Sequence, residues 1–296
     1  MALIPFDDRD GWIWLDGKMV PWRDAKLHVL THGLHYASSV FEGERAYNGK
    51  IFKGTEHSER LRTSAELLGF EIPYSAAELD EAKAAVLAKN NLTNAYLRPV
   101  AWRGSEMMAI AAQATTTHVA IAAWEWPSYF SPELKAKGLK LQTATWRRPD
   151  PATAPVHSKA AGLYMICTMS KHDAERNGFH DAMMLDFEGN VAECTGANIF
   201  FGFNGELHTP QADRFLNGIT RRTVIDLAKG LGITVVERRI KPEELAKADE
   251  VFVTGTAAEI TRIGQIDAHM FQAGKLTERL EEAYQFATGQ KVAAAA

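Results

Sequence analysis

The sequence predicts a two-domain α/β (α+β) protein, and three observations lead to this fold class. The chain has 296 residues, which is enough for about two domains at roughly 150 residues each. Short strand-like segments alternate with amphipathic helical segments in both halves. Pro127 and Pro132 interrupt every periodic pattern between the halves. We therefore expect a small α+β domain at residues 1–126, an interdomain loop at 127–138 and a larger domain at 139–296.

Composition excludes several classes of protein. The 33 basic and 37 acidic residues give a net charge of −4, and no basic run interleaved with aromatic residues suggests nucleic-acid binding. No apolar run approaches the ~20 residues that span a membrane, and Asp7 and Asp8 leave no room for a signal peptide. Cys167 and Cys194 form no CxxC pair, so we expect a protein of the reducing cytoplasm.

The first domain begins with turn signals between strand-like segments. Asp16-Gly17 and Asn48-Gly49 supply the positive φ that two-residue hairpin turns require. The first pair joins strands within 12–22. Apolar spacing further along the chain predicts helices at 56–68 and 79–89 and strands at 94–102 and 118–126.

The second domain begins with a strand at 140–146 and a long helix at 160–177. Two hairpins follow, one over 182–193 and one turning at Asn204-Gly205. The remaining predicted elements are a helix at 218–231, a strand at 233–238, a short helix beginning at Pro242 and a strand at 250–254.

Common catalytic and nucleotide-binding motifs are missing from the sequence. We find no GxxxxGK[ST], GxGxxG, HExxH or GxSxG segment. The nearest metal-like feature is the trio His28, His32 and His35, in which the first two could share a helix face. Because no carboxylate or cysteine stands at a matching spacing, we interpret them as packing or loop histidines and predict no metal site.

Lys159 is the first candidate for chemistry. It lies in the segment His157–Tyr164 among small residues, at the start of an apolar helix. Close approach of a ligand and partial desolvation would favour the neutral, nucleophilic amine. Most lysines are solvated surface charges, so this segment alone leaves both interpretations open.

Three later segments supply matching groups. Glu193 stands among apolar and small residues at the end of a hairpin strand. At the start of the next helix, the N–H groups of Ile219 and Thr220 could bind a phosphate, and a further turn contains Gly255-Thr256. Each segment also has an ordinary explanation: a surface glutamate, a simple helix cap or a strand-to-helix turn.

In this order, the four segments resemble the fold-type IV pyridoxal-phosphate enzymes, and most closely the branched-chain amino acid aminotransferases. The resemblance covers nearly the whole chain. It extends to His35–Gly43, Glu56–Leu61, Ala95–Pro99 and Asn217–Ala258. Each match is weak alone, but jointly they are specific. The resemblance implies a small N-terminal α+β domain and a larger, cofactor-anchoring C-terminal domain with a pseudo-barrel sheet.

The resemblance also implies roles at the cofactor. Lys159 would form the Schiff base (internal aldimine) with pyridoxal 5'-phosphate and carry the 1,3-proton transfer between the substrate Cα and the cofactor C4′. Glu193 would pair with the pyridine nitrogen, and Tyr164 with the 3′-oxygen. The phosphate would be held by Arg60, Ile219, Thr220 and Thr256, and Leu216 would pack on the ring.

The implied activity is transamination of L-leucine, L-isoleucine and L-valine with 2-oxoglutarate, within EC class 2.6.1. The ligands would be small amino acids and 2-oxo acids. The substrate-binding residues would be Tyr36, Phe41, Tyr96, Arg98, Trp126, Tyr129, Thr256, Ala257 and Ala258. In the family, Tyr36 reaches the site from a partner subunit and Tyr129 lies on a mobile interdomain loop, which implies at least a homodimer.

Alternatives on the same fold are D-amino-acid aminotransferase, R-selective amine transaminase and aminodeoxychorismate lyase. Arg98 beside Tyr96 favours the branched-chain interpretation, as does Gly255–Ala258. The segment around Cys194 and the loop Met107–Ala111 depart from the family pattern and leave substrate preference open. A non-catalytic member of the fold is a further alternative, although it would have no need to keep the complete cofactor set.

Overall fold

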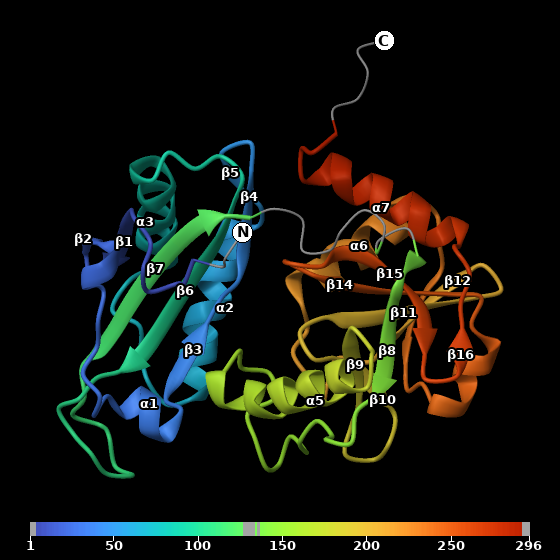
Figure 1. Ribbon diagram of the computed structural model, residues 1–296, viewed down its shortest axis with the longest axis horizontal. Coiled ribbons are helices and arrows are strands. Elements are labelled where there is room, and N and C mark those ends of the chain that lie inside the picture. Colours follow the sequence, from blue (N-terminus) through green and yellow to red (C-terminus); the bar gives the residue numbers. More distant parts are fainter. Residues whose placement is uncertain (1–3, 127–133, 135–136, 292–296) are drawn as a thin grey trace. The chain divides into compact units, whose positions relative to one another are not determined.

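The computed structural model describes residues 4–126, 134 and 137–291, which fall into two compact units (Figure 1). The first unit comprises the described residues up to Trp126 together with Ser158–Gly162, and the second comprises the remainder. Tyr129 and most of the expected loop 127–138 lie outside the described residues. The domain boundaries stay a prediction.

An antiparallel sheet forms the centre of the first unit. Its strand order is β2-β1-β7-β6-β4-β5, with β3 also paired to β6. Positive φ at Asp16 and Asn48 confirms the two predicted turns. The strands are β1 (Trp12–Leu15), β2 (Lys18–Pro21), β3 (Ser39–Phe41), β4 (Glu44–Tyr47), β5 (Lys50–Ile51), β6 (Ala95–Arg103) and β7 (Thr117–Glu125).

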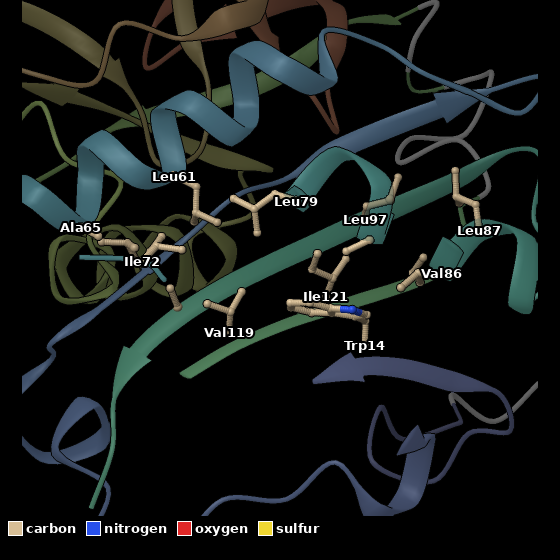
Figure 2. Close-up of a cluster of buried hydrophobic side chains, with 14 of the residues drawn as sticks. Trp14, Leu61, Ala65, Ile72, Leu79, Val86, Leu87, Leu97, Val119 and Ile121 are labelled. Carbon is tan, nitrogen blue, oxygen red and sulfur yellow. The ribbon is translucent and has the colours of Figure 1, made fainter. Parts of the chain in front are cut away.

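Two helices, α2 (Gly54–Leu67) and α3 (Ala76–Lys89), pack on this sheet. Leu61 of α2 and Val86 of α3 join Leu97 and Ile121 in one buried apolar cluster (Figure 2). Both helices were predicted, but α3 begins three residues earlier than expected. Ser75 accepts a hydrogen bond from the Glu78 N–H while the Glu78 carboxylate accepts one from the Ser75 N–H, and this reciprocal cap fixes the start. Short helical segments also occur at Trp22–Asp24 (η1) and His32–Tyr36 (α1).

The second unit contains a curled, mixed sheet of order β10-β9-β8-β15-β14-β11-β12-β13, with β16 paired to β15. β8 runs parallel to β9 and β15, and β12 runs parallel to β13. The strands are β8 (Leu139–Thr143), β9 (Asp181–Leu185), β10 (Val191–Cys194), β11 (Asn198–Phe203), β12 (Glu206–Pro210), β13 (Val235–Arg238), β14 (Glu250–Gly255), β15 (Glu259–Ile266) and β16 (His269–Met270).

Helices α5 (Met165–Arg176), α6 (Ile219–Gly230) and α7 (Lys275–Ala287) belong to the second unit, as does the 3₁₀ turn η3 (Pro242–Lys247). The continuous helix predicted at 160–177 is wrong in its first turn, which is the 3₁₀ segment η2 (Ala161–Tyr164). Ala160 pairs with Val40 in an isolated bridge that keeps its backbone extended, and Gly162 disfavours the helix. In the described part of the chain, no helix has the length and apolar character to cross a membrane.

Candidate active site

Backbone hydrogen bonds fix the position of Lys159 in the first unit. Its N–H donates to the Ser64 hydroxyl on α2 at 3.0 Å, and its carbonyl accepts from the Phe41 N–H at 3.2 Å. The neighbouring Ser158 hydroxyl donates to the Ser64 carbonyl at 2.9 Å. Lys159 is thus held against both a helix and the sheet, and its side chain is half-buried.

Five of the predicted residues are linked by a series of contacts that begins at the Phe41 ring. The Lys159 Nζ lies 4.9 Å from the centroid of the Phe41 ring, and the Arg98 guanidinium carbon lies 4.7 Å from it. Arg98 Nη2 donates to the Tyr96 hydroxyl at 3.0 Å. The Tyr96 ring lies 4.8 Å from that of Trp126. The structure therefore brings an amine, a guanidinium and aromatic surfaces together.

Arg60 projects from α2 to a buried carboxylate that we had not assigned. Its Nε and Nη2 donate to the two oxygens of Glu42 at 2.6 and 2.7 Å, and His57 Nδ1 lies 2.7 Å from Oε2. Burial alone would raise the pKa of Glu42, but the Arg60 charge and His57 hold that pKa well below its usual range. The signal in the sequence was a glutamate in an otherwise strand-like segment.

In the second unit, Glu193 near the end of β10 has a partner for each oxygen. The Arg148 Nε lies 3.2 Å from Oε1, and the Asn198 amide donates to Oε2 at 3.2 Å. Burial would lower the pKa of Arg148, but Glu193, Cys167 and Tyr164 together outweigh burial and the pKa is raised. Tyr164, half-buried at the end of η2, also interacts electrostatically with Arg148. Sequence reasoning missed both Arg148 and Asn198.

Besides Arg60, the predicted phosphate-binding residues lie at the start of α6 and just after β14. Gly218 precedes α6, and among the described residues no side chain caps that end, so the first N–H groups of the helix have no side-chain acceptor there. Thr220 is buried in the first turn, and Leu216 lies in the loop just before it. Thr254 near the end of β14 pairs with Asn198 at the start of β11. The half-buried turn Thr256–Ala258 therefore lies at the end of the sheet where β11 begins.

Tyr36, His32 and His35 lie on α1 of the first unit, and His28 precedes that helix. Tyr36 is 42% exposed on α1, where its ring stacks on that of His32. Nε2 of His32 bonds to the Ala109 carbonyl, Nε2 of His35 bonds to that of Val29, and Nδ1 of His28 accepts from the Leu30 N–H. Over the described residues, no group of three or more His, Cys, Asp or Glu side chains could hold a metal ion.

Comparison with known proteins identifies the family of the chain. Residues 39–266 match the family model described as amino-transferase class IV. The chain belongs to this family. It is 44% identical over 284 residues to the branched-chain-amino-acid aminotransferase of Pseudomonas aeruginosa, covering 94% of this chain and 92% of that protein.

Solved structures give the same family. The branched-chain aminotransferase of Thermoproteus uzoniensis, solved with norvaline, matches with a TM-score of 0.91 and 38% identity over 96% of both chains. The branched-chain amino acid aminotransferase of Thermobaculum terrenum, solved in its PLP-form, matches with a TM-score of 0.86 and 30% identity over 95% of both chains. These matches confirm the predicted fold class and the resemblance to branched-chain aminotransferases.

Proposed function

We propose that this class IV aminotransferase moves the amino group between branched-chain L-amino acids and 2-oxoglutarate. The observation that carries the proposal is the group of residues around Phe41. Lys159 and Arg98 lie against one aromatic ring, Tyr96 is bonded to Arg98, and Trp126 lies next to Tyr96. Such a set supplies an amine for the chemistry, apolar walls for a branched side chain and a cation for a second carboxylate.

The donor set fits pyridoxal 5'-phosphate as the cofactor. Glu193 is a carboxylate whose ionised form the adjacent Arg148 favours, so it suits a protonated pyridine nitrogen. The uncapped N–H groups of Ile219 and Thr220 suit a phosphate. The relative from Thermobaculum terrenum was solved in the holo-form with this cofactor. When bound, pyridoxal phosphate supplies an electron sink for negative charge at the substrate Cα.

Each remaining residue then has a defined task. Lys159 would be the nucleophile and would carry the proton between the substrate Cα and the cofactor C4′. Glu193 would keep a proton on the pyridine nitrogen. Tyr164 would hydrogen-bond the 3′-oxygen. Arg60 and Thr256 would complete the phosphate site, and Leu216 would cover the ring face.

We assign the substrate contacts as follows. Arg98 Nε is buried and has no hydrogen-bond acceptor among the described residues, so it can donate to the second carboxylate of glutamate or 2-oxoglutarate. Phe41, Tyr96 and Trp126 would contact the apolar side chain. The backbone at Ala257 and Ala258 would hold the α-carboxylate, and Tyr129 would reach the substrate from the loop 127–138.

Exposed apolar residues on the first unit favour a homodimer, and the state of the cysteines favours the cytoplasm. Leu27, Val29 and Leu34 are 53–66% exposed, and Ile110 is 84% exposed. They lie on the segments next to Tyr36 and Ala109, and an exposed apolar group of this kind usually marks an interface. A second copy would cover these residues, and Tyr36 would then act in the partner's site. Both cysteines are free and buried, as suits a reducing compartment.

A direct assay tests the proposed function. The purified, cofactor-loaded protein is incubated with 2-oxoglutarate and one amino acid, and L-glutamate and D-glutamate are quantified separately. We expect glutamate from L-leucine, L-isoleucine and L-valine. Glutamate formed with none of the three would overturn the proposal. Activity with D-alanine alone, which yields D-glutamate, would favour a D-amino-acid aminotransferase.

A further inference from the structure

Strand β11, labelled in Figure 1, begins at Asn198, whose buried side chain bonds to two other segments of the second unit. Its amide nitrogen donates to Glu193 Oε2 and to the Leu216 carbonyl, each at 3.2 Å. Its amide oxygen accepts from the Gly218 N–H, also at 3.2 Å. Asn198 thus connects the acid of β10 with the loop that leads into α6.

The orientation of this amide is determined by its partners. An ionised carboxylate and a backbone carbonyl can only accept hydrogen bonds, and a backbone N–H can only donate. The nitrogen must therefore face Glu193 and Leu216, and the oxygen must face Gly218. With 5% of its surface exposed, Asn198 has no nearby solvent to replace these bonds.

Gly218 makes the close approach possible. A Cβ added there would lie only 2.2 Å from Asn198 Oδ1 and 3.6 Å from the Cβ of Arg221. The loop could not then approach the amide so closely. The hydrogen bond between the Gly218 N–H and the Asn198 amide oxygen therefore requires glycine at position 218.

We infer that Asn198 is a positioning residue that sets the spacing between Glu193 and the N-terminus of α6. The inference rests on the proposed function, in which Glu193 pairs with the pyridine nitrogen and α6 holds the phosphate. Both ends of one rigid cofactor then meet protein groups whose separation a single amide fixes. Loss of this amide weakens cofactor binding, although the proposed function assigns Asn198 no contact with the cofactor.

The test uses two substitutions at this position and one control. Asn198→Ala removes all three bonds. Asn198→Asp keeps the shape but places a second carboxylate beside Glu193. Asn190→Ala is the matched control, because Asn190 is 3% exposed in the same unit and, among the described residues, its side-chain amide bonds only to Asp186. The dissociation constant of each apoprotein for pyridoxal 5'-phosphate is measured from pH 5.5 to 8.0, with circular dichroism as a check of folding.

We expect Asn198→Ala to weaken binding by at least about tenfold at every pH, and Asn190→Ala to stay within about threefold of wild type. The result for Asn198→Asp depends on pH. Glu193 on β10, with Arg148 beside it, is the charged group that faces the new carboxylate, while the guanidinium of Arg221 on α6 is paired with Glu237. Two adjacent carboxylates share a proton at low pH. The protonated form can still donate to Glu193, so binding approaches wild type at pH 5.5 and weakens by about tenfold or more toward pH 8.0.

The outcomes separate the inference from the proposed function. A wild-type protein that binds no pyridoxal phosphate overturns the proposed function. If wild type binds the cofactor and transaminates, the inference alone fails where Asn198→Ala binds as tightly as wild type. It also fails if the ratio of the dissociation constants of Asn198→Asp and wild type for pyridoxal 5'-phosphate does not change with pH. If Asn198→Ala does not fold, the pH dependence of Asn198→Asp decides.

Discussion

Arg60 and Glu42 form a bidentate ion pair in which two guanidinium nitrogens each donate to one carboxylate oxygen, at 2.6 and 2.7 Å. Glu42 is fully buried and Arg60 is largely so. The carboxylate therefore fixes the direction of a side chain that we assign to the phosphate. Two nitrogens of Arg60 are committed to this pair, so its remaining nitrogen has a defined place.

Glu42→Gln should destabilise the protein by about 3 kcal/mol at pH 7, because it leaves the Arg60 charge uncompensated in a buried site. The low pKa of Glu42 in the folded state gives the sign of the pH dependence. Its contribution is present above the unfolded glutamate pKa of about 4.3 and is lost as pH falls below that value. Urea unfolding should show that the difference in free energy of unfolding between wild type and variant is smaller at pH 4 than at pH 7.

The control for this prediction is Glu56→Gln on α2, the helix that carries Arg60. Glu56 pairs with Lys53 at 2.7 Å, but both side chains are at least 40% exposed. A surface pair contributes about 0–1 kcal/mol. An equal loss of unfolding free energy in both variants would contradict a large stabilising contribution from the buried Arg60–Glu42 pair.

Lys159→Ala should lower transamination by more than about 10³-fold, because no other group replaces the amine. The backbone bonds to Ser64 and Phe41 do not involve the side chain, so the melting temperature of the apoprotein should change by only a few degrees. Activity and thermal unfolding are measured on the same preparation. Near-normal turnover would refute the role of Lys159.

Arg98→Met should raise KM for 2-oxoglutarate by about 10- to 100-fold, because it removes the cation that pairs with the second carboxylate. The KM for L-leucine should change by less than about threefold. Arg103→Met on the same strand is the control, since Arg103 bonds to the backbone oxygens of Gly69 and Ala112. Equal effects on both substrates in Arg98→Met would place its role outside substrate choice.

Both cysteines should be inert in the folded protein. Burial raises the pKa of the Cys167 thiol to about 11 and raises that of Cys194 as well, so neither is a thiolate at neutral pH. We expect a chromogenic disulfide reagent to label both thiols in urea. In the native protein, fewer than about one in ten of the thiols should be labelled in the same reaction time. Cys167→Ala should keep its activity, and rapid native labelling would contradict this account.

Local signals were sufficient for much of the fold. Asp16-Gly17 and Asn48-Gly49 specify their turns through positive φ, and apolar spacing identified α2 and α3. The start of α5 was predicted wrongly, because the bridge between Ala160 and Val40 joins residues far apart in the chain. Strand β15 and helix α7 were not predicted from their own sequence patterns.

The candidate site shows the same division. Lys159, Glu193 and the start of α6 stand in recognisable segments, so sequence alone could name them. Their supporting residues could not be named in this way, because Glu42, Arg148 and Asn198 act through contacts across the fold. Asn198, for example, meets Gly218 across 20 residues of chain. Such pairs become visible only once the sheet places them together.

The visible absorption spectrum of the cofactor-loaded protein tests the central claim most directly. L-leucine, L-glutamate and D-alanine are added separately in the absence of any oxo acid. We predict that L-leucine and L-glutamate each convert the visible band of bound pyridoxal phosphate into the near-ultraviolet band of pyridoxamine phosphate, and that D-alanine does not. A protein that shows no visible band after loading, or that responds to D-alanine alone, would contradict the account.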